Sequence, residues 1–466
     1  ADSIFDVRNA NMNRRKFLRA STLGAAGVAD STAAPGNVYR EPAREIPIGD
    51  TADVIVCGAG PAGVAAAISA ARTGARTRLF DVHGCLGGIW TAGLLSNIID
   101  CLDKGGIMDE ILAGLKKMDA QIDGPRYDTE AMKLLLDRMT AEAGVKILLH
   151  TRVVAAAKDG NRVTTIVTEN KSGRQAWRAK TFVDSTGDGD LAAFAGCKFD
   201  LGHPQSGKMQ PMTLMAILTG IDYRELHAHR LMRGDGKSSY AKGVSPNESK
   251  VNLVAELRRA GVEPSYTGPA LFPIRNDLIA FMVNHEYGYS GLNAEHVTKA
   301  TIHGRAEVNH VVDALRAHGG AWKNVRLVAT GAQIGVREGR RIHGLYSLNK
   351  DDLMRGARFE DAVCRVNVGV DIHSIDPSVN KRTTDGGVKA KAYDVPLRSL
   401  IARDVDGLVM AGRCISGDFF AHASYRMTGH AVPMGEAAGR LAAIAARTDR
   451  APREVPFREV IRRESA

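Results

Sequence analysis

The clearest pattern along the chain is a short apolar run at residues 52–57, followed at once by glycines and then by an alanine-rich segment. An apolar run of this length without alternation predicts a buried strand of a parallel sheet. Residues 64–73, with five alanines, predict a helix that packs closely on that sheet, and Gly74 predicts its end. Residues 76–81 predict a second strand, which ends in an acid. The predicted order is strand, glycine turn, helix, strand.

Weaker patterns of the same kind continue toward the C-terminus. Strands are predicted at residues 150–154, 178–184, 212–219, 326–330 and 407–411, and helices at 251–260, 295–318 and 433–446. Asp159-Gly160 predicts a hairpin turn, and Pro433 would stand in the first turn of the last helix, where proline is tolerated. These elements predict an α/β fold with a Rossmann-like domain and an inserted α+β region.

The first glycine turn has the G-x-G-x-x-G pattern of dinucleotide-binding folds. Gly58 would permit the tight turn, Gly60 would let the backbone approach a pyrophosphate, and Gly63 would let helix and strand pack closely. The helix N-terminus offers free N–H groups to the anion. Asp81, which stands 18 residues after Gly63, would accept hydrogen bonds from the adenosine ribose.

Composition narrows the class of protein. With 466 residues, 44% of them hydrophobic, the chain has enough apolar material for two or three folded domains. The net charge of +10 favours anionic ligands, but no run of five basic residues indicates a nucleic-acid partner. No apolar stretch approaches the ~20 residues that a transmembrane helix needs.

The N-terminus looks like a targeting segment. Residues 13–19 (NRRKFLR) match a twin-arginine export signal, and the weakly apolar residues 20–29 follow it as its h-region would. This pattern predicts a periplasmic or secreted protein; without export the protein would be cytoplasmic. The six cysteines contain no C-x-x-C pair, so no zinc or iron–sulfur site is predicted, while an oxidising compartment would allow one disulfide.

Further glycine-rich motifs follow the first. They are GGIWTAG at residues 87–93, GGIMDEIL at 105–112, DSTGDGDLA at 184–192, GAQIGVREGRRI at 331–342, DIH at 371–373 and AGRCIS at 411–416. Together these motifs resemble the FAD-dependent oxidoreductase family over residues 50–446, and more distantly the fumarate reductase flavoproteins. The resemblance implies a glutathione-reductase-like fold.

It also implies domain limits and FAD contacts. The limits are 1–49 for signal and linker, 50–200 with 395–450 for a discontinuous FAD-binding domain, 201–394 for a substrate or cap domain, and 451–466 for a tail. The implied FAD-binding residues are Gly58, Gly60, Pro61, Ala62, Gly63, Asp81, Gly87, Gly88, Val153 through its backbone, Gly187, Asp188, Gly412, Arg413 and Pro433. FAD is expected to bind without a covalent bond, although His83 and Cys85 lie on its expected path.

Candidate catalytic residues cluster in the segment expected as a loop before the last helix. Tyr425 or His422 would act as acid or base, Arg426 would anchor a carboxylate or oxyanion, and His430 would lie near the pyrimidine end of the flavin. Isolated polar residues in loops usually have only structural roles, so these assignments depend on the clustering.

A second charged cluster comprises Arg337, Glu338, Arg340 and Arg341. It is expected to join the two domains through ion pairs, with substrate binding as the alternative, and Arg337 and Arg341 would share a face if the segment were helical. Asp371 and His373 are weaker candidates for the same cleft. His303 and His310 share a helix face but lack a third ligand, so no metal is proposed.

These features predict an enzyme that moves a hydride between FAD and a small polar hydroxy or carboxylate metabolite. Because no second strand–G-x-G-x-x-G–helix unit is present, electrons would pass to a separate carrier or acceptor. One alternative is fumarate-reductase-like reduction of an activated C=C bond, with Arg426 as the proton donor. Another is a non-catalytic flavin-binding or electron-transfer partner protein.

Overall fold

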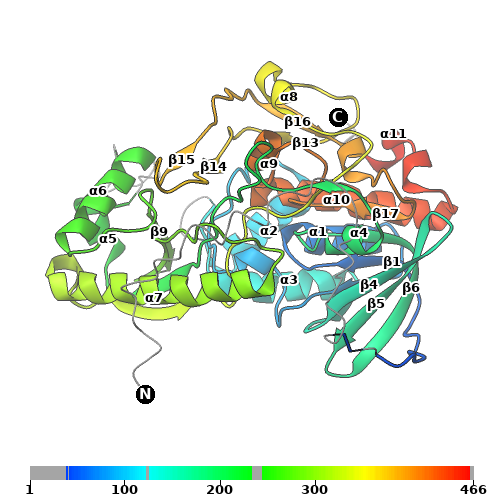
Figure 1. Cartoon of the computed structure of the whole chain (residues 1–466), viewed down its shortest axis with the longest axis horizontal. Helices are drawn as coiled ribbons and strands as arrows, with labels where there is room; N and C mark the ends of the chain where they lie inside the picture. The colour runs from blue at the N-terminus through cyan, green and yellow to red at the C-terminus, as the bar shows by residue number, and fades with distance from the viewer. Residues whose placement is uncertain (1–37, 40, 122–124, 233–243, 276, 462–466) are drawn as a thin grey trace. The chain divides into compact units, whose positions relative to one another are not determined.

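The computed structural model describes residues 38–39, 41–121, 125–232, 244–275 and 277–461 (Figure 1). The predicted twin-arginine segment lies outside the described residues. The chain divides into two compact units, Ala1–Glu45 and Ile46–Ala466, and the elements below all belong to the second.

A seven-stranded sheet forms the first layer. Its strands are β1 (Ala52–Cys57), β2 (Thr77–Phe80), β3 (Lys146–Leu148), β4 (Arg152–Asp159), β5 (Arg162–Asn170), β6 (Gly173–Asp184) and β17 (Leu408–Met410). Their order is β3-β2-β1-β6-β5-β4, with β17 also paired to β6. In the parallel part, Asp184 lies opposite both Cys57 and Met410, so β1, β6 and β17 end at the same edge. Ligands of open α/β sheets bind at this carboxyl edge.

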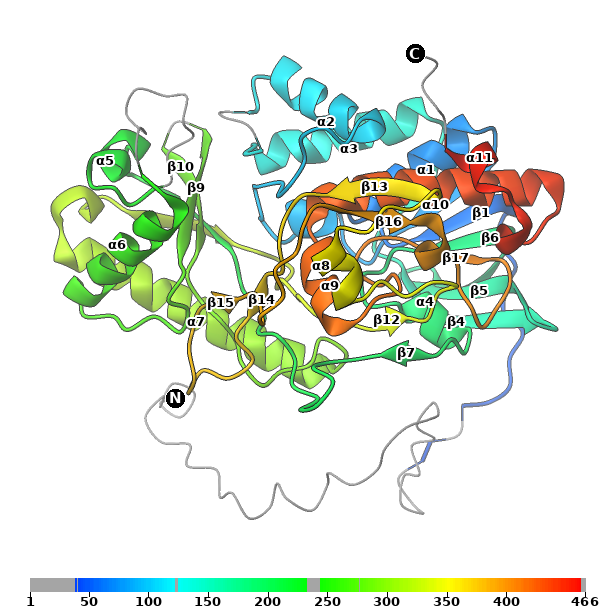
Figure 2. The same cartoon turned by 90° about the horizontal axis from the view of Figure 1, so that it is seen from above.

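Two helices pack closely on the sheet and on each other, α1 (Pro61–Arg72) and α10 (Thr428–Thr448) (Figure 2). A Cβ added to Gly435 or Gly439 would lie 2.0 Å from the carbonyl oxygen of Ala62 or Ala66, respectively, so this contact requires glycine. The last helix starts before the predicted residue 433, and Pro433 lies inside it. The added first turn is stabilised by tertiary contact rather than by local sequence, because Gly429 rests against the carbonyl groups of Ile99 and Asp100.

The same layer carries α2 (Gly106–Lys117), α3 (Thr129–Glu142) and the short α4 (Asp190–Phe194). The predicted helix at residues 64–73 corresponds to α1, which starts earlier because Pro61 occupies its first turn. The strand predictions near residues 52–57, 76–81 and 178–184 are confirmed by β1, β2 and β6.

A second, antiparallel sheet lies in the region expected to cap the flavin. It has four strands in the order β11-β8-β10-β9: β11 (Arg326–Thr330), β8 (Ala216–Thr219), β10 (Leu278–Met282) and β9 (Ala270–Arg275). The same region of the chain contains the helices α5 (Tyr223–Ala228), α6 (Pro246–Arg259) and α7 (Ala294–His318). Leu218, Leu257, Val311 and Trp322 belong to its separate hydrophobic core. The predicted helix at 295–318 is confirmed by α7, whose Asn293 cap accepts a hydrogen bond from the His296 N–H.

The chain then returns to the first layer. The returning elements are β12 (Arg341–Ile342), which pairs with β7 (Phe199–Asp200), α8 (Lys350–Arg355), β13 (Ala362–Val366), β14 (Ile372–His373), β15 (Thr383–Thr384), β16 (Tyr393–Pro396), α9 (Phe419–Tyr425) and α11 (Phe457–Val460). Buried residues such as Leu353, Val366 and Tyr393 belong to the first core, so the limit expected at residue 394 falls inside that core. In the predicted tail, Val455 and Val460 are buried in the same core.

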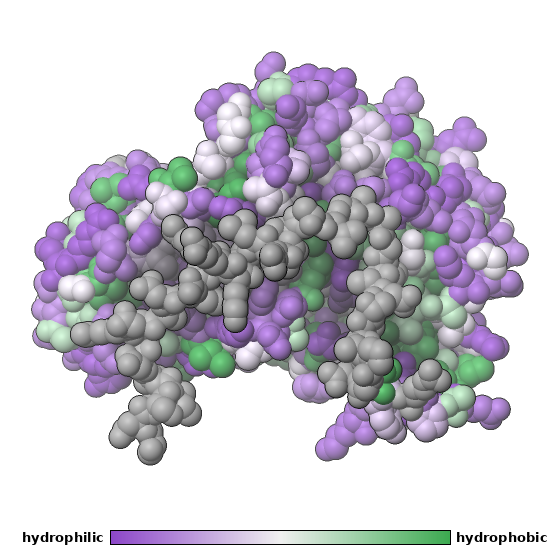
Figure 3. All heavy atoms as spheres, in the orientation of Figure 1, coloured by the Kyte–Doolittle hydropathy of each residue, from purple (hydrophilic) through white to green (hydrophobic). Residues whose placement is uncertain are grey.

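The face drawn in Figure 3 is mostly hydrophilic, and the cysteines form no disulfide. Hydrophilic side chains cover most of the face drawn in Figure 3, with hydrophobic residues scattered among them. Among the described residues, no helix has both the length and the apolar character to cross a membrane. All six cysteines are free.

Candidate active site

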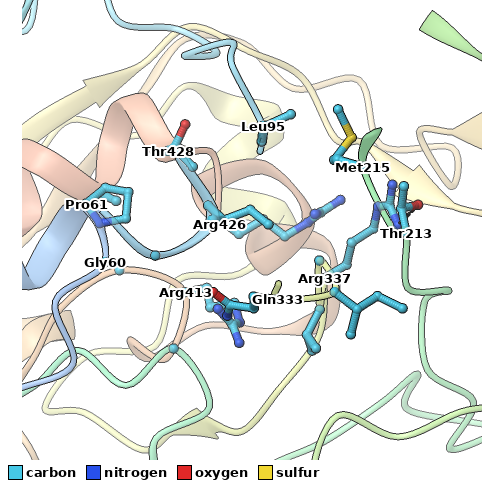
Figure 4. Close-up of a pocket in the computed structure, with 18 of the residues that line it drawn as sticks. Gly60, Pro61, Leu95, Thr213, Met215, Gln333, Arg337, Arg413, Arg426 and Thr428 are labelled. Carbon is cyan, nitrogen blue, oxygen red and sulfur yellow. Dashed lines mark hydrogen bonds between the residues drawn. The ribbon is translucent and has the colours of Figure 1, made fainter. Parts of the chain in front are cut away.

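A cavity of about 1090 Å³ follows the carboxyl edge of the first sheet and continues toward the second sheet; Figure 4 draws some of the residues that line it. At one end it is lined by Gly58, Asp81 and Val153, and at the other by Arg337 and Arg426. An elongated cavity at this edge is where an α/β fold of this type binds a dinucleotide.

Three glycines shape the first end of the cavity in different ways. Gly58 has φ +95°, and a Cβ there would lie 2.5 Å from the carbonyl oxygen of Ser185. A Cβ on Gly63 would lie 1.7 Å from the carbonyl oxygen of Gly58, so the turn and α1 could not meet. A Cβ on Gly60, in contrast, would have no protein atom within 4 Å, and Gly60 lines the cavity. Gly58 and Gly63 therefore serve the fold, whereas Gly60 leaves space for a ligand.

The start of α1 provides an anion site. The first turn has no side-chain cap, so its N–H groups are available to a ligand in the cavity. Beside it, the Asp81 carboxylate accepts hydrogen bonds from the N–H groups of Ala59 and His83. Burial raises the pKa of Asp81, while these two N–H donors oppose the shift. The arrangement holds a carboxylate at the position predicted to bind the ribose.

The glycine turn at residues 184–192 contacts two later segments of the chain, at Arg340 and at Arg413. Asp188 pairs with Arg413 at 2.7 Å, and Arg340 donates to the Asp188 carbonyl oxygen at 2.9 Å. Gly339 lies so close to Asp188 that a Cβ there would be 2.2 Å from Oδ1. The prediction that the 337–341 cluster joins the domains is supported by the contacts of Arg340 with Asp188 and Asp190, whereas the buried Arg341–Glu338 pair at 2.8 Å lies within the cluster. The segment before Arg341 is not helical, so Arg337 and Arg341 share no helix face.

Most residues predicted to bind FAD line the cavity: Gly58, Gly60, Pro61, Ala62, Asp81, Gly88, Val153, Gly187, Asp188, Gly412 and Arg413. The other three lie behind its wall. Gly63 packs on Gly58, the Gly87 N–H donates to the Ala59 carbonyl oxygen at 2.7 Å, and Pro433 is buried within α10. The space left beside Gly60, the uncapped start of α1 and the Asp81 carboxylate, which is expected to bind the ribose, all fit FAD. His83 also lines the cavity, near Asp81, which places it at the expected adenosine end.

Two arginines converge at the other end of the cavity (Figure 4). Arg337 Nη1 donates to the Pro211 carbonyl oxygen at 2.7 Å and to Thr213 Oγ1 at 2.8 Å. No carboxylate of the described residues forms an ion pair with Arg337. Burial, together with the nearby Arg426 cation, lowers the pKa of Arg337 to about 10.

Arg426 has only a distant carboxylate partner. Its Nη2 donates to the Asp371 carbonyl oxygen at 2.7 Å, while Asp371 Oδ2 lies 3.4 Å away. Among the described residues at this end of the cavity, these two arginine cations lie with one lining carboxylate, that of Asp371, which leaves an excess of positive charge there. A buried anion would be stabilised at this position by charge-assisted hydrogen bonds.

A histidine pair completes the site. His373 Nε2 lies 3.1 Å from Asp371 Oδ2, and His373 Nδ1 lies 2.9 Å from His285 Nε2. Tyr266 stacks on His285 with ring centroids 3.8 Å apart. Asp371, His373 and Tyr266 line the cavity, so the weaker prediction for Asp371 and His373 is supported by their positions. Sequence reasoning missed Tyr266 and His285, because no local motif surrounds them.

Of the four predicted catalytic residues, only Arg426 lines the cavity. The expected loop contains a helix, α9, which turns His422 and Tyr425 into the protein interior. The Tyr425 hydroxyl donates to the Ile415 carbonyl oxygen at 2.8 Å, and His430 Nε2 pairs with Asp100 at 2.6 Å. Burial lowers the pKa of His422 and raises that of Tyr425. Their positions therefore do not support the acid–base roles predicted for His422, Tyr425 and His430.

One other polar group lies near the site. Glu286, His303 and Glu307 bring ligand atoms within 4.8 Å of one another, whereas His310 is not part of this group. Their hydrogen bonds are already made: His303 Nδ1 to Glu286 at 2.7 Å, and Ser265 to Glu307 at 2.7 Å and 2.9 Å. The group is explained as a hydrogen-bonded network.

Comparisons with solved structures found several matches at low sequence identity. A geranylgeranyl bacteriochlorophyll reductase-like protein from Thermoplasma acidophilum is 14% identical, with a TM-score of 0.42, over 86% of this chain and 80% of that chain. The flavin-dependent brominase Bmp2 is 13% identical, with a TM-score of 0.47, over 85% and 80%. The myxobacterial chondrochloren halogenase CndH, an FAD-dependent halogenase, is 12% identical, with a TM-score of 0.47, over 88% and 78%.

A comparison with curated proteins found no match. The model of the family described as FAD dependent oxidoreductase, in contrast, matches residues 53–463, which is most of the chain. This match agrees with the space left beside Gly60 and with the cavity at the sheet edge. The chain is an enzyme that uses FAD, and it belongs to the FAD-dependent oxidoreductase family.

Proposed function

We propose that the enzyme transfers a hydride between FAD and a small hydroxy-carboxylate metabolite, and that its electrons pass to a separate acceptor. The observation that carries this proposal is Arg337, a cavity arginine without an ion-pair partner among the described carboxylates. A half-buried cation without a counter-ion is costly, and a substrate carboxylate would neutralise it. Arg426 lies in the same part of the cavity and would contact the other side of that carboxylate (Figure 4).

The remaining cavity groups supply orientation and proton chemistry. Bound FAD would supply the hydride acceptor or donor. The Asp371 carboxylate has 36% of its side chain exposed, and it lines the same cavity as the two arginines. Burial alone would raise its pKa, but His373, Arg426 and Arg337 together lower it below its usual value. Asp371 is therefore ionised at neutral pH and can accept a proton from a substrate hydroxyl.

Anaerobic spectroscopy tests this function. We expect a hydroxy acid to bleach the flavin absorption band near ~450 nm, because the hydride reduces the flavin. The panel contains hydroxy acids, and as matched controls the corresponding amides and esters, together with sugars and amines. Bleaching by the neutral analogues as fast as by the acids, or by none of the panel, would contradict the proposal. NAD⁺ added to the reduced enzyme should reoxidise it slowly.

A second candidate is reduction of an activated C=C bond next to a carboxylate. The specific observation is that neither cavity arginine has a close carboxylate partner among the described residues, and burial lowers the pKa of both. Such an arginine gives up a proton more readily than a solvated one. If dithionite-reduced enzyme is reoxidised by an enoate but the oxidised enzyme is not bleached by hydroxy acids, this candidate replaces the first.

We also propose export through the twin-arginine segment at residues 13–19. Replacement of both Arg14 and Arg15 by lysine keeps the charge but removes the signal, so we expect the protein to stay in the cytoplasm. Cell fractionation and immunoblotting measure the result, with Arg19→Lys as the control. Equal periplasmic amounts of the double variant and the parent protein would exclude this route.

A further inference from the structure

A chain of hydrogen bonds leads from the cavity to a half-buried tyrosine outside its wall. Asp371 Oδ2 lies 3.1 Å from His373 Nε2, and His373 Nδ1 lies 2.9 Å from His285 Nε2. His285 Nδ1 then lies 3.1 Å from the Tyr287 hydroxyl. Asp371 and His373 line the cavity, whereas His285 and Tyr287 do not.

We infer that Tyr287, His285 and His373 relay the proton that accompanies the hydride, between Asp371 in the cavity and the Tyr287 side of the protein. This inference rests on the proposed function. Asp371 would be the catalytic residue that touches the substrate. His285 and Tyr287 act through His373 and are positioning residues.

The direction of each hydrogen bond follows from the ionised state of Asp371. A carboxylate only accepts, so His373 must carry its proton on Nε2, and its Nδ1 must accept from the Nε2–H of His285. His285 Nδ1 then accepts from the Tyr287 hydroxyl. Both histidines are neutral in this arrangement. Burial, followed by the nearby Arg337 cation, lowers the pKa of His373 to about 3, and the same causes lower the pKa of His285.

A second arrangement exists when Asp371 is protonated. Every hydrogen bond in the chain then reverses, and the Tyr287 hydroxyl donates instead to the Ser265 carbonyl oxygen, 3.3 Å away. The two arrangements differ by one proton, and all of the named groups keep a partner in both. The structure thus provides two satisfied states, which a relay requires and a static network does not.

The framework around the relay keeps the rings in place. The backbone N–H of His285 donates to Ser265 Oγ at 2.8 Å. Ser265 in turn donates to the Glu307 carboxylate, from its hydroxyl at 2.7 Å and from its backbone N–H at 2.9 Å. Tyr266 covers one face of the His285 ring. Burial raises the pKa of Tyr287 to about 12, so its hydroxyl keeps its proton at neutral pH.

The proton and electron balance is simple. During oxidation of a hydroxy acid, the C–H bond would break with its electron pair, and bound FAD would accept this hydride. The O–H bond breaks as the C=O bond forms, and the proton goes to Asp371. The relay passes one proton outward to Tyr287 before the next turnover, and reduction of a substrate uses the same steps in reverse.

Nitrogen NMR of histidine-labelled holoenzyme tests the relay without any substrate. We expect the signals of His285 and His373, assigned with single Asn variants, to show neutral Nε2–H tautomers at pH 7. Tyr287→Phe should shift the Nδ1 signal of His285 and slow the exchange of the His373 Nε2–H with water by about 10-fold or more, since a positioned acid–base group contributes at least this factor. Tyr289→Phe, a change of the same size two residues away, should alter neither.

The opposite outcomes overturn the relay. A histidine of the pair found as the Nδ1–H tautomer or doubly protonated in the resting enzyme breaks the assigned directions. Unchanged exchange in Tyr287→Phe shows that the cavity proton reaches water by another path. Because no substrate is used, these failures are distinct from failure of the hydroxy-acid panel, which concerns the proposed function alone.

Discussion

Gly63→Ala should destabilise the apoprotein by about 3 kcal/mol or more, the upper range for overpacking a core, whereas Gly60→Ala should leave its stability nearly unchanged. The reason is the space at each position: a Cβ meets the Gly58 carbonyl oxygen at 1.7 Å in the first case and nothing within 4 Å in the second. Gly60 also has φ −66°, which alanine adopts freely. Thermal unfolding of FAD-depleted protein, followed by circular dichroism, measures both changes.

Gly60→Ala, although nearly neutral for stability, should strongly weaken FAD binding. Its added methyl group would occupy the cavity beside the uncapped start of α1, where the pyrophosphate is expected. We expect the FAD dissociation constant to rise about 10- to 100-fold, as 1–3 kcal/mol of overpacking corresponds to. Fluorescence titration of apoprotein with FAD measures it. Wild-type affinity in Gly60→Ala, or wild-type stability in Gly63→Ala, would refute the distinct roles assigned to these glycines.

The nucleotide end of the molecule could be predicted because its signals are local. β1, α1 and β2 follow one another within thirty residues, and each is specified by its own apolar run and by the glycines between them. Asp81 is found by counting from Gly63. The family resemblance added the later glycine turns, whose residues Gly187, Asp188 and Gly412 line the same cavity.

The substrate end could not be predicted in the same way. Arg337, Asp371, His373 and Arg426 come from three separate segments, and His285 and Tyr266 come from two more. No spacing in the sequence records that the segments carrying His285, Asp371 and Arg426 meet. The polar cluster at 422–430 reaches the cavity through Arg426, whereas the helix α9 buries His422 and Tyr425.

Arg337 illustrates what local reasoning could recover. The sequence showed four charged residues within five positions and predicted ion pairs between domains. Arg340 does form such a pair with Asp190, while Arg341 pairs with Glu338 inside the cluster itself. Arg337 differs because its guanidinium donates to a carbonyl and a hydroxyl instead of a carboxylate. Only the fold shows that Arg337 has no carboxylate partner among the described residues, unlike its neighbours Arg340 and Arg341.

Arg337→Gln should raise the KM for a carboxylate substrate about 30-fold or more, because loss of one partner of a buried charge pair costs 2–5 kcal/mol. The change in kcat should be smaller, since Arg337 binds the carboxylate in both ground and transition states. Arg337→Lys keeps the charge but not both hydrogen bonds to Pro211 and Thr213, and an intermediate KM is expected. Arg305→Gln, an exposed arginine on α7, is the matched control.

The amide of the same substrate separates charge recognition from structural damage. If Arg337 binds the carboxylate, the amide should already be a poor substrate for the parent enzyme, and Arg337→Gln should cost it little more. If the variant loses as much toward the amide as toward the acid, the arginine maintains the cavity wall through Pro211 and Thr213 instead. In that case the excess positive charge of the cavity would have to be assigned to Arg426, and the same pair of substrates measured with Arg426→Gln would show whether a carboxylate is recognised there.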